Sequence, residues 1–290
     1  MIIHPYALIS PEAVIGQDVH IGPFSTVEAG VVIGDGCRVA ARVTIKSGVR
    51  LGKENEICEG AVLGGVAQHL SPSAEIGGLV IGDRNIIREN STLHRAMHAG
   101  ADTRMGNDCL LMVGAHVAHD CVIDDHVVLT NNVMLAGHVE VGSRAYLGGG
   151  VAVHQFCRVG RVAMVGGLAR VVQDVPPFVT IDGSSGHIVG LNRVGLRRAG
   201  LQLHEIKQLK AAYQLIYRSG LPFETRLETL REQFPSGPAA EFEEFFRGGS
   251  RGFVRERRTP PGATIRPLHE APGKTTAQPA SLPAIIKKAG

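Results

Sequence analysis

The stretch Ile3–Gly34, IHPYALISPEAVIGQDVHIGPFSTVEAGVVIG, places an aliphatic residue at every sixth position. The same phase continues to Val171, and 26 of the 29 positions that it marks carry Val, Ile, Leu or Met; the exceptions are His69, Glu75 and Ala99. A period of six fits neither a helix nor an alternating strand. It indicates short strands separated by tight corners, with three six-residue segments forming one coil of a stacked repeat.

Small residues occupy two further positions of the repeat. Glycine often follows the aliphatic residue, and a small residue often stands four positions after it, as at Ala13, Ser25 and Ala61. Glycine is expected where the backbone turns with a positive φ or approaches a neighbouring coil closely. Four of the five cysteines occupy the small inward position and are expected to fill the core: Cys37, Cys109, Cys121 and Cys157.

The repeat has two interruptions and one end. Roughly Gly65–Leu79 and Arg95–Arg104 are expected to form loops outside the coil. After Val171 the period stops, and helical spacing begins at Leu203 and ends at Ser219-Gly220, followed by a second helical stretch at about 222–246. We therefore predict a β-helix catalytic domain over 1–185, a helical domain over 186–257 and a disordered tail over 258–290.

Composition excludes several classes of protein. The 30 basic and 27 acidic residues nearly cancel, and no basic run interleaved with aromatic residues suggests nucleic-acid binding. Five cysteines without a CxxC pair argue against a secreted disulfide framework. The N-terminus lacks the pattern of a signal peptide, and no run of 18 apolar residues occurs. We expect a cytoplasmic protein without a membrane span.

Seven of the thirteen histidines lie between residues 94 and 154. Because one coil has three times six residues, position 119 stacks beneath 137, so His119, His138 and His154 fall at neighbouring places on three successive coils. Three interpretations compete: surface histidines without a common task, a zinc site of three nitrogens, and a general base. Asp120 could orient His119 only if a corner of the coil brings the two side chains together.

Four segments carry a specific resemblance: GAHVAHDC (114–121), NNVMLAGHVEVG (131–142), VHQFCRVG (153–160) and VQDVPPF (172–178), with YRSG at 217–220. The repeat resembles the hexapeptide-repeat acyltransferases, which implies a left-handed parallel β-helix. The segments resemble the acyl-carrier-protein–dependent UDP-N-acetylglucosamine O-acyltransferases of lipid A biosynthesis over roughly residues 1–255. The related N-acyltransferases carry an extra N-terminal uridine-binding domain, whereas these hexads begin at Ile3.

The resemblance implies roles for individual residues. His119 is the implied general base, Asp120 its support and the Gly137 N–H the oxyanion donor. Met164 and Gly167 are the implied acyl-chain residues, and a glycine at 167 leaves room for a longer chain. The implied substrate-binding residues are Gln68, His94, His116, His138, His154, Gln155, Asn192 and Arg198, the last two contributed by a neighbouring subunit.

The resemblance also implies partners. The acyl donor is acyl carrier protein, an acidic protein, and a candidate basic docking patch is Arg193, Arg197, Arg198, Lys207 and Lys210. An ordinary solvated face is the alternative for these charges. The family implies a homotrimer with sites between subunits, no cofactor and no metal.

The chain departs from the family pattern at substrate-binding positions. Gln68-His69-Leu70-Ser71 replaces a Gln-Asp-Leu-Lys run, Val194 replaces a Glu, and Ser184-Ser185 replaces Asn-His. These changes leave open a related nucleotide sugar as acceptor, such as an amino-substituted analogue. Two further alternatives are a metal-dependent hydratase on the same fold and a non-catalytic trimer whose site has decayed.

Overall fold

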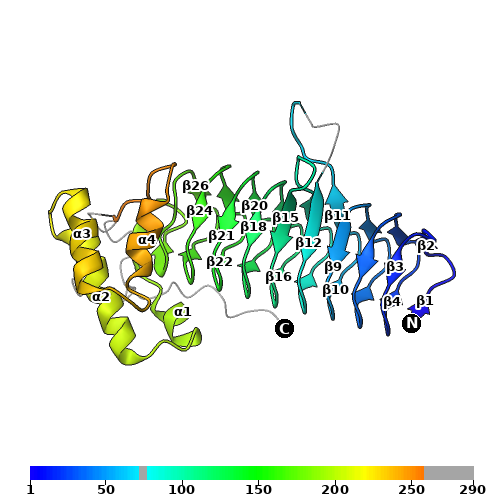
Figure 1. Ribbon diagram of the computed structural model, residues 1–290, viewed down its shortest axis with the longest axis horizontal. Coiled ribbons are helices and arrows are strands. Elements are labelled where there is room, and N and C mark those ends of the chain that lie inside the picture. Colours follow the sequence, from blue (N-terminus) through cyan, green and yellow to red (C-terminus); the bar gives the residue numbers. More distant parts are fainter. Residues whose placement is uncertain (72–76, 258–290) are drawn as a thin grey trace, which may run out of the picture. The chain divides into compact units, whose positions relative to one another are not determined.

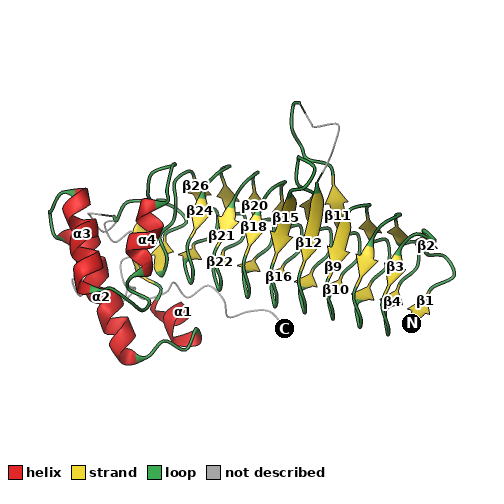
Figure 2. Cartoon of the chain, in the orientation of Figure 1, coloured by secondary structure: helices red, strands yellow, loops and turns green. Residues whose placement is uncertain are grey.

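The computed structural model describes residues 1–71 and 77–257, and Met1–Arg257 form one compact unit. Glu75 and the tail predicted over 258–290 lie outside the described residues. Short strands dominate the first part of the unit, and four helices follow them (Figures 1 and 2).

The strands form three sheets, which are the three faces of a coil. Sheet A contains β1 (Ile2–Ile3), β4 (His20–Ile21), β7 (Arg38–Val39), β10 (Glu56–Ile57), β13 (Ile86–Ile87), β16 (Leu110–Leu111), β19 (Val128–Leu129), β22 (Tyr146–Leu147), β25 (Met164–Val165), β27 (Val179–Ile181) and β28 (Ile188–Leu191). Sheet B contains β2 (Leu8–Ile9), β5 (Thr26–Val27), β8 (Thr44–Ile45), β11 (Val62–Gly65), β14 (Thr92–His94), β17 (His116–Val117), β20 (Met134–Leu135), β23 (Ala152–Val153) and β26 (Arg170–Val171). Sheet C contains β3 (Val14–Ile15), β6 (Val32–Ile33), β9 (Val49–Leu51), β12 (Gly78–Ile81), β15 (Asp102–Met105), β18 (Val122–Ile123), β21 (Glu140–Val141) and β24 (Arg158–Val159).

Each strand pairs in parallel with the corresponding strand one coil later, as Ile2 with His20, except that β28 pairs antiparallel with β27. The register jumps twice, where Val49 pairs with Leu79 and Gly78 with Asp102. Both jumps follow a strand of sheet B, after β11 and after β14, which confirms the two predicted loops. We call the segments that join sheet B to sheet C the B–C corner, and those that join sheet C to sheet A the C–A corner.

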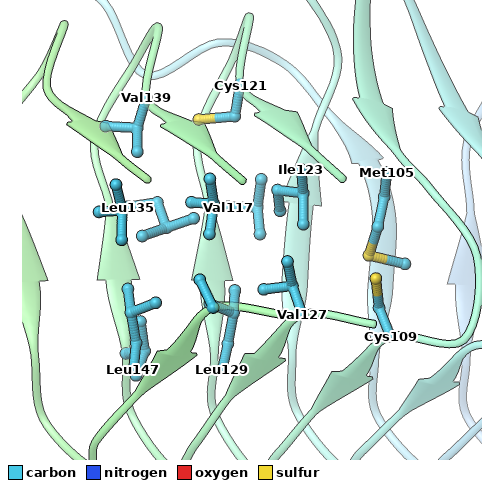
Figure 3. Close-up of a cluster of buried hydrophobic side chains, with 14 of the residues drawn as sticks. Met105, Cys109, Val117, Cys121, Ile123, Val127, Leu129, Leu135, Val139 and Leu147 are labelled. Atoms are coloured by element: carbon cyan, nitrogen blue, oxygen red, sulfur yellow. The ribbon is translucent and has the colours of Figure 1, made fainter. Parts of the chain in front are cut away.

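The interior is a column of small and branched side chains. Val117 and Leu135, on successive coils, and Val139, four residues after Leu135, are fully buried, and Figure 3 shows them pointing into the space between the three sheets. The cysteines at the inward position are buried and unbridged, and burial raises the pKa of the Cys109 and Cys121 thiols to about 12. Their predicted role as core filler is therefore confirmed.

The corners explain the glycines. Most coil corners hold one residue with positive φ, and this residue is more often non-glycine than glycine, for example Asp120 (59°) and His138 (59°). Most of the glycines that directly follow the aliphatic residue have ordinary φ values instead; Gly64 (84°), in the first interruption, is an exception. At Gly34 an added Cβ would lie 2.5 Å from the Gly52 carbonyl oxygen. Of the two expected reasons for these glycines, close approach of the next coil therefore applies.

Four helices follow the strands: α1 (Arg193–Arg198), α2 (Leu203–Arg218), α3 (Phe223–Gln233) and α4 (Glu241–Arg247). The helix predicted to end at Ser219-Gly220 is α2. The stretch expected at 222–246 is two helices rather than one, because Pro235 and Pro238 flank Gly237, whose φ is +77°. In the described part of the chain, no helix is both long enough and apolar enough to cross a membrane.

The helices pack against the last coils of the β-helix. Arg161 on that face forms a two-pronged ion pair with Glu241 on α4, with Nη2 2.6 Å from Oε1. The segment after α4 then returns to the strands, where isolated bridges join Asp174 to Phe253 and Ile188 to Glu256. The predicted architecture, a β-helix of hexads followed by a small helical region, is confirmed.

Candidate functional site

The B–C corner after β17 brings His119 and Asp120 together. Asp120 adopts a φ of 59°, so the chain turns at this residue and its side chain comes to the same side as its neighbour's. His119 Nδ1 lies 2.7 Å from Asp120 Oδ2, and both side chains are largely buried. The corner that the sequence required for this contact is therefore present.

The second loop and β15 hold Asp120 in place. The Asp120 N–H donates to Thr103 Oγ1 at 2.7 Å, and the Met97 N–H donates to Asp120 Oδ2 at 3.2 Å. Because a carboxylate only accepts hydrogen bonds, His119 Nδ1 carries the proton of this contact. Nε2 of His119 is then left with a free lone pair, as a general base needs.

Gly137 covers the His119 ring from the next coil. An added Cβ at this glycine would lie 2.6 Å from His119 Cε1 and 2.7 Å from Nε2. The His138 N–H donates to the His119 carbonyl at 3.1 Å, which fixes the spacing of the two coils. Among the described residues the Gly137 N–H has no protein acceptor, so it is available to a ligand beside Nε2.

His138 extends the arrangement by one coil, and Phe156 by another. The His138 ring meets the His119 ring edge to face with centroids 5.2 Å apart, and its Nε2 lies 3.8 Å from Asp120 Oδ2. Phe156 stacks on His138 at 4.6 Å. Burial lowers the pKa of His138, although Asp120 acts in the opposite direction. His154 and Gln155 lie exposed beside Phe156 on the same coil.

His94 and His116 form a second pair at the edge of sheet B, where β14 and β17 are neighbours. Their rings meet edge to face at 4.9 Å, and His116 Nδ1 bonds Thr92 Oγ1 at 2.8 Å. Burial lowers the pKa of His94 to about 4, with the nearby His116 as a further cause, and burial also lowers the pKa of His116. Both rings are therefore neutral near pH 7.

The first loop contributes His69 to this region. Its ring lies edge to face with His119 at 6.2 Å, and its Nδ1 accepts a hydrogen bond from the Ser71 N–H at 3.1 Å. Gln68, immediately before it, is exposed. One of the residues that departs from the family pattern thus faces the candidate base directly.

Four predicted site residues lie elsewhere in the chain. The Asn192 side chain is buried as the N-cap of α1, accepting from the Gly195 N–H at 2.9 Å and donating to the Val162 carbonyl at 2.8 Å. Arg198 is exposed at the end of α1. Met164 lies on β25 of sheet A, and Gly167 lies in the corner that joins sheet A to sheet B. One chain therefore does not place these residues at the corner that carries His119.

Sequence reasoning missed three residues that build the site. Thr103 and Met97 hold Asp120 from the second loop region, and the Arg251 guanidinium lies 3.0 Å from His154 Nδ1. Arg251 stands 97 residues after His154 and outside the repeat, so no period could have placed it. A sequence signal for Thr103 existed, because it is a polar residue at a position that faces the core.

The same side chains offer an arrangement for a metal. His119, Asp120 and His138 each present one ligand atom, and these atoms lie within 4.8 Å of one another. Asp120 Oδ2, however, already accepts hydrogen bonds from His119 and the Met97 N–H. A site with two histidines and one committed carboxylate differs from the three-histidine zinc site that the hydratase alternative requires.

Comparisons with known proteins agree on one family. Residues 174–254 match the family described as "Udp N-acetylglucosamine O-acyltransferase; Domain 2", and residues 12–47 and 102–137 match bacterial transferase hexapeptide repeats. A relative from Halorhodospira halophila, an acyl-[acyl-carrier-protein]–UDP-N-acetylglucosamine O-acyltransferase, is 43% identical over 87% of this chain and 99% of its own. One of the same name from Janthinobacterium is 42% identical over 88% and 99%.

Solved structures give the same result. The UDP-N-acetylglucosamine O-acyltransferase of Moraxella catarrhalis is 39% identical, with a TM-score of 0.83 over 88% of this chain and 100% of its own. A second such structure, from Acinetobacter baumannii, is 38% identical, with a TM-score of 0.84 over 88% and 100%. The left-handed coil of the β-helix, predicted from the family resemblance, agrees with the match to these structures.

Proposed function

Because the chain belongs to the family of UDP-N-acetylglucosamine O-acyltransferases, we propose that it transfers a fatty acyl group from acyl carrier protein to the 3-hydroxyl of UDP-N-acetylglucosamine. This reaction is the first step of lipid A synthesis. The observation that carries the proposal is the His119–Asp120 pair with its Nδ1–Oδ2 distance of 2.7 Å, covered by the backbone of Gly137.

The geometry supports a direct transfer. His119 Nε2 removes the proton of the sugar hydroxyl as its oxygen attacks the thioester carbonyl carbon, and Asp120 stabilises the imidazolium that forms. The Gly137 N–H stabilises the negative charge that develops on the carbonyl oxygen. As the C–S bond breaks, the imidazolium returns the proton to the departing thiolate. No group beyond the two substrates is consumed.

The remaining site residues fit substrate contacts on either side of the base. His138, His154 and Gln155 lie on the two coils that follow His119, His116 lies on the same coil, His94 on the coil before it and Gln68 in the first loop; we assign these residues to the nucleotide sugar. Asn192, Arg198, Met164 and Gly167 lie away from this corner of the chain. Their assignment to nucleotide and acyl chain therefore requires a neighbouring subunit, and we propose a homotrimer.

The donor is a (3-hydroxy) acyl thioester of acyl carrier protein, and the open position at Gly167 fits a longer chain. Five basic residues are exposed on α1 and α2 and are the proposed docking site for an acidic carrier protein: Arg193, Arg197, Arg198, Lys207 and Lys210. We also propose that the protein acts in the cytoplasm.

One assay tests this proposal. The protein is incubated with acyl-carrier-protein thioesters of several chain lengths, with and without a 3-hydroxyl, and with UDP-N-acetylglucosamine or its 3-amino analogue. Products are identified by mass. A 3-O-acylated UDP-N-acetylglucosamine is the expected product, and the absence of any acylated nucleotide sugar would refute the proposal.

The amino-substituted acceptor is the alternative that a specific observation favours. His69, which replaces the Asp of the family run, faces the His119 ring, so the surroundings of the reacting group differ from the family pattern. An amino acceptor would show as an N-acylated product at higher kcat/KM in the same assay. His69→Asp should then shift the preference toward the hydroxyl.

Two other functions are tested without the transfer assay. The metal-dependent alternative predicts stoichiometric zinc in the purified protein, lost in His138→Ala. The non-catalytic alternative predicts that UDP-N-acetylglucosamine fails to bind at sub-millimolar concentration by calorimetry. We expect no bound zinc and measurable binding.

A further inference from the structure

Arg251 reaches the histidine corner from the far end of the chain. Its Nη2 lies 3.0 Å from Nδ1 of His154, which is exposed, whereas Arg251 is half-buried. None of the four sequence segments that carry the resemblance, nor YRSG at 217–220, includes this residue. Its position beside a residue assigned to substrate binding therefore asks for an explanation of its own.

The position of Arg251 is fixed by the backbone on its C-terminal side. The Asp174 N–H donates to the Gly252 carbonyl at 2.8 Å, and the Val254 N–H donates to the Asp174 carbonyl at 3.0 Å. Phe253 packs on Phe246 of α4 with ring centroids 4.6 Å apart. The returning segment is thus attached to both the last coil and the helices, and it delivers the guanidinium to His154 without a flexible linker.

Two groups compete for the same nitrogen of His154. Nδ1 lies 3.0 Å from Arg251 Nη2 and 3.1 Å from the Gln155 carbonyl oxygen. A guanidinium only donates hydrogen bonds and a carbonyl only accepts them, while a neutral ring nitrogen either carries a proton or accepts one. Nδ1 can therefore satisfy only one of the two groups at a time. A permanently charged guanidinium at this distance disfavours a proton on Nδ1.

We propose that Arg251 is a positioning residue that holds His154 as the neutral tautomer with its proton on Nε2. Nε2–H then points a hydrogen-bond donor at an acceptor oxygen of the nucleotide sugar. Without Arg251, Nδ1 takes the proton and donates it to the Gln155 carbonyl, and Nε2 becomes an acceptor that repels the same oxygen. This inference rests on the proposed function only for the identity of the ligand.

The tautomer is measured directly, without substrate. Two-bond ¹H–¹⁵N correlation spectra of protein labelled at the histidine rings distinguish the two forms, and the His154 signals are identified by their loss in His154→Gln. The wild-type protein should show the Nε2–H form. Arg251→Met, which keeps an unbranched apolar stem but no hydrogen-bond donors, should shift His154 to the Nδ1–H form. Arg251→Lys, which keeps a cationic donor, should retain Nε2–H.

Kinetics give the consequence. In Arg251→Met the KM for UDP-N-acetylglucosamine should rise about tenfold, as expected for the loss of one hydrogen bond to a charged group, with kcat changed less than about threefold. Arg255→Met, on the same segment and exposed, is the control and should leave both unchanged. A KM that stays at the wild-type value in Arg251→Met would overturn the proposal.

The two proposals fail in different ways. If the acyltransferase function is wrong, the wild-type protein yields no acylated nucleotide sugar. If the role of Arg251 is wrong, the His154 tautomer is the same in the wild type and Arg251→Met, whatever the activity. A melting temperature of Arg251→Met within a few degrees of the wild type shows that the segment still docks.

Discussion

The C–A corner and the B–C corner both turn at residues with positive φ, such as His126 (59°) and Asp120 (59°), but their polar side chains bond to different groups. At the C–A corner, polar side chains of one coil accept hydrogen bonds from backbone N–H groups of the previous coil, as in the pairs Gln17–Asp35 (2.9 Å), Lys53–Asp83 (2.7 Å), Asp83–Asn107 (2.8 Å) and Asn107–Asp125 (2.6 Å). At the B–C corner, both loops leave the coil, and Asp120 bonds to the neighbouring His119 and to the second loop instead.

The difference shows how a repeat acquires a site. Polar groups that bond from coil to coil are already committed to holding the stack together. At the B–C corner the Met97 N–H and Thr103 take over part of that bonding. Nε2 of His119 and the N–H of Gly137 are consequently left for substrate. We expect changes at the two corners to affect different quantities, activity at one and stability at the other.

The largest expected effect is that of His119→Ala. Removing the base should lower kcat/KM for acyl transfer by about 10²–10⁴-fold, whereas losing its hydrogen bond to Asp120 should cost only about 1 kcal/mol of stability. The control is His126→Asn, an exposed C–A corner histidine whose φ of 59° suits asparagine. Activity of His119→Ala near that of His126→Asn would remove the distinction between the corners.

The second effect concerns pH. Because the pKa of His94 falls from 6.5 in the unfolded chain to about 4 in the folded protein, the unfolded state binds more protons between these values. The contribution of His94 to the free energy of unfolding is therefore fully present above pH 6.5. It falls by about 3 kcal/mol as the pH decreases to 4. Denaturant unfolding of the wild type and His94→Gln across this range measures it. The carboxylates titrate in both proteins, so their contribution cancels in the difference between them. Equal slopes of the unfolding free energy against pH for the two proteins would contradict the prediction.

A pair of glycine substitutions separates the corners again. In Gly137→Ala the new Cβ meets the His119 ring, which can shift, so activity should fall at least tenfold with little loss of stability. In Gly34→Ala the new Cβ meets the backbone carbonyl of Gly52, which cannot shift. The free energy of unfolding should therefore fall by about 1–3 kcal/mol. Turnover and urea unfolding of both variants test this. The reverse pattern would mean that Gly137 serves only packing.

The smallest effect is that of Asp83→Ala at the C–A corner. Losing the acceptor for the Lys53 N–H should cost about 1 kcal/mol of stability, with kcat and KM unchanged. Urea unfolding and the transfer assay measure the two. A drop in turnover comparable with that of Gly137→Ala would show that the C–A corner also supports the reaction.

The sequence predicted the fold and the position of His119 relative to the next coil, because the period relates distance along the sequence to distance along the stack of coils. Position 119 was placed beneath 137, and the Gly137 backbone does lie over the His119 ring. The phase persisted through both loops, since pairs that span them are separated by 30 and 24 residues, which are whole numbers of hexads. The core cysteines followed from the same reasoning.

The sequence could not predict the contacts of residues outside the hexad repeat. Arg251 meets His154 through a segment whose course depends on bridges to Asp174 and Ile188. The use of the Asn192 amide as a helix cap likewise follows from where α1 begins. The break between α3 and α4 was readable from Pro235 and Pro238, but helical spacing on both sides of it concealed the interruption.

The corner positions of His119, His138 and His154 also set the direction of anything that touches all three. Successive coils are separated by the spacing of paired strands, about 4.8 Å, so these side chains span roughly 10 Å parallel to the axis of the stack. A ligand in contact with all of them is extended along that axis and rests on the ridge of the corner. The distance along the axis between the His154 contact and His119 then determines which hydroxyl of the ligand lies beside His119.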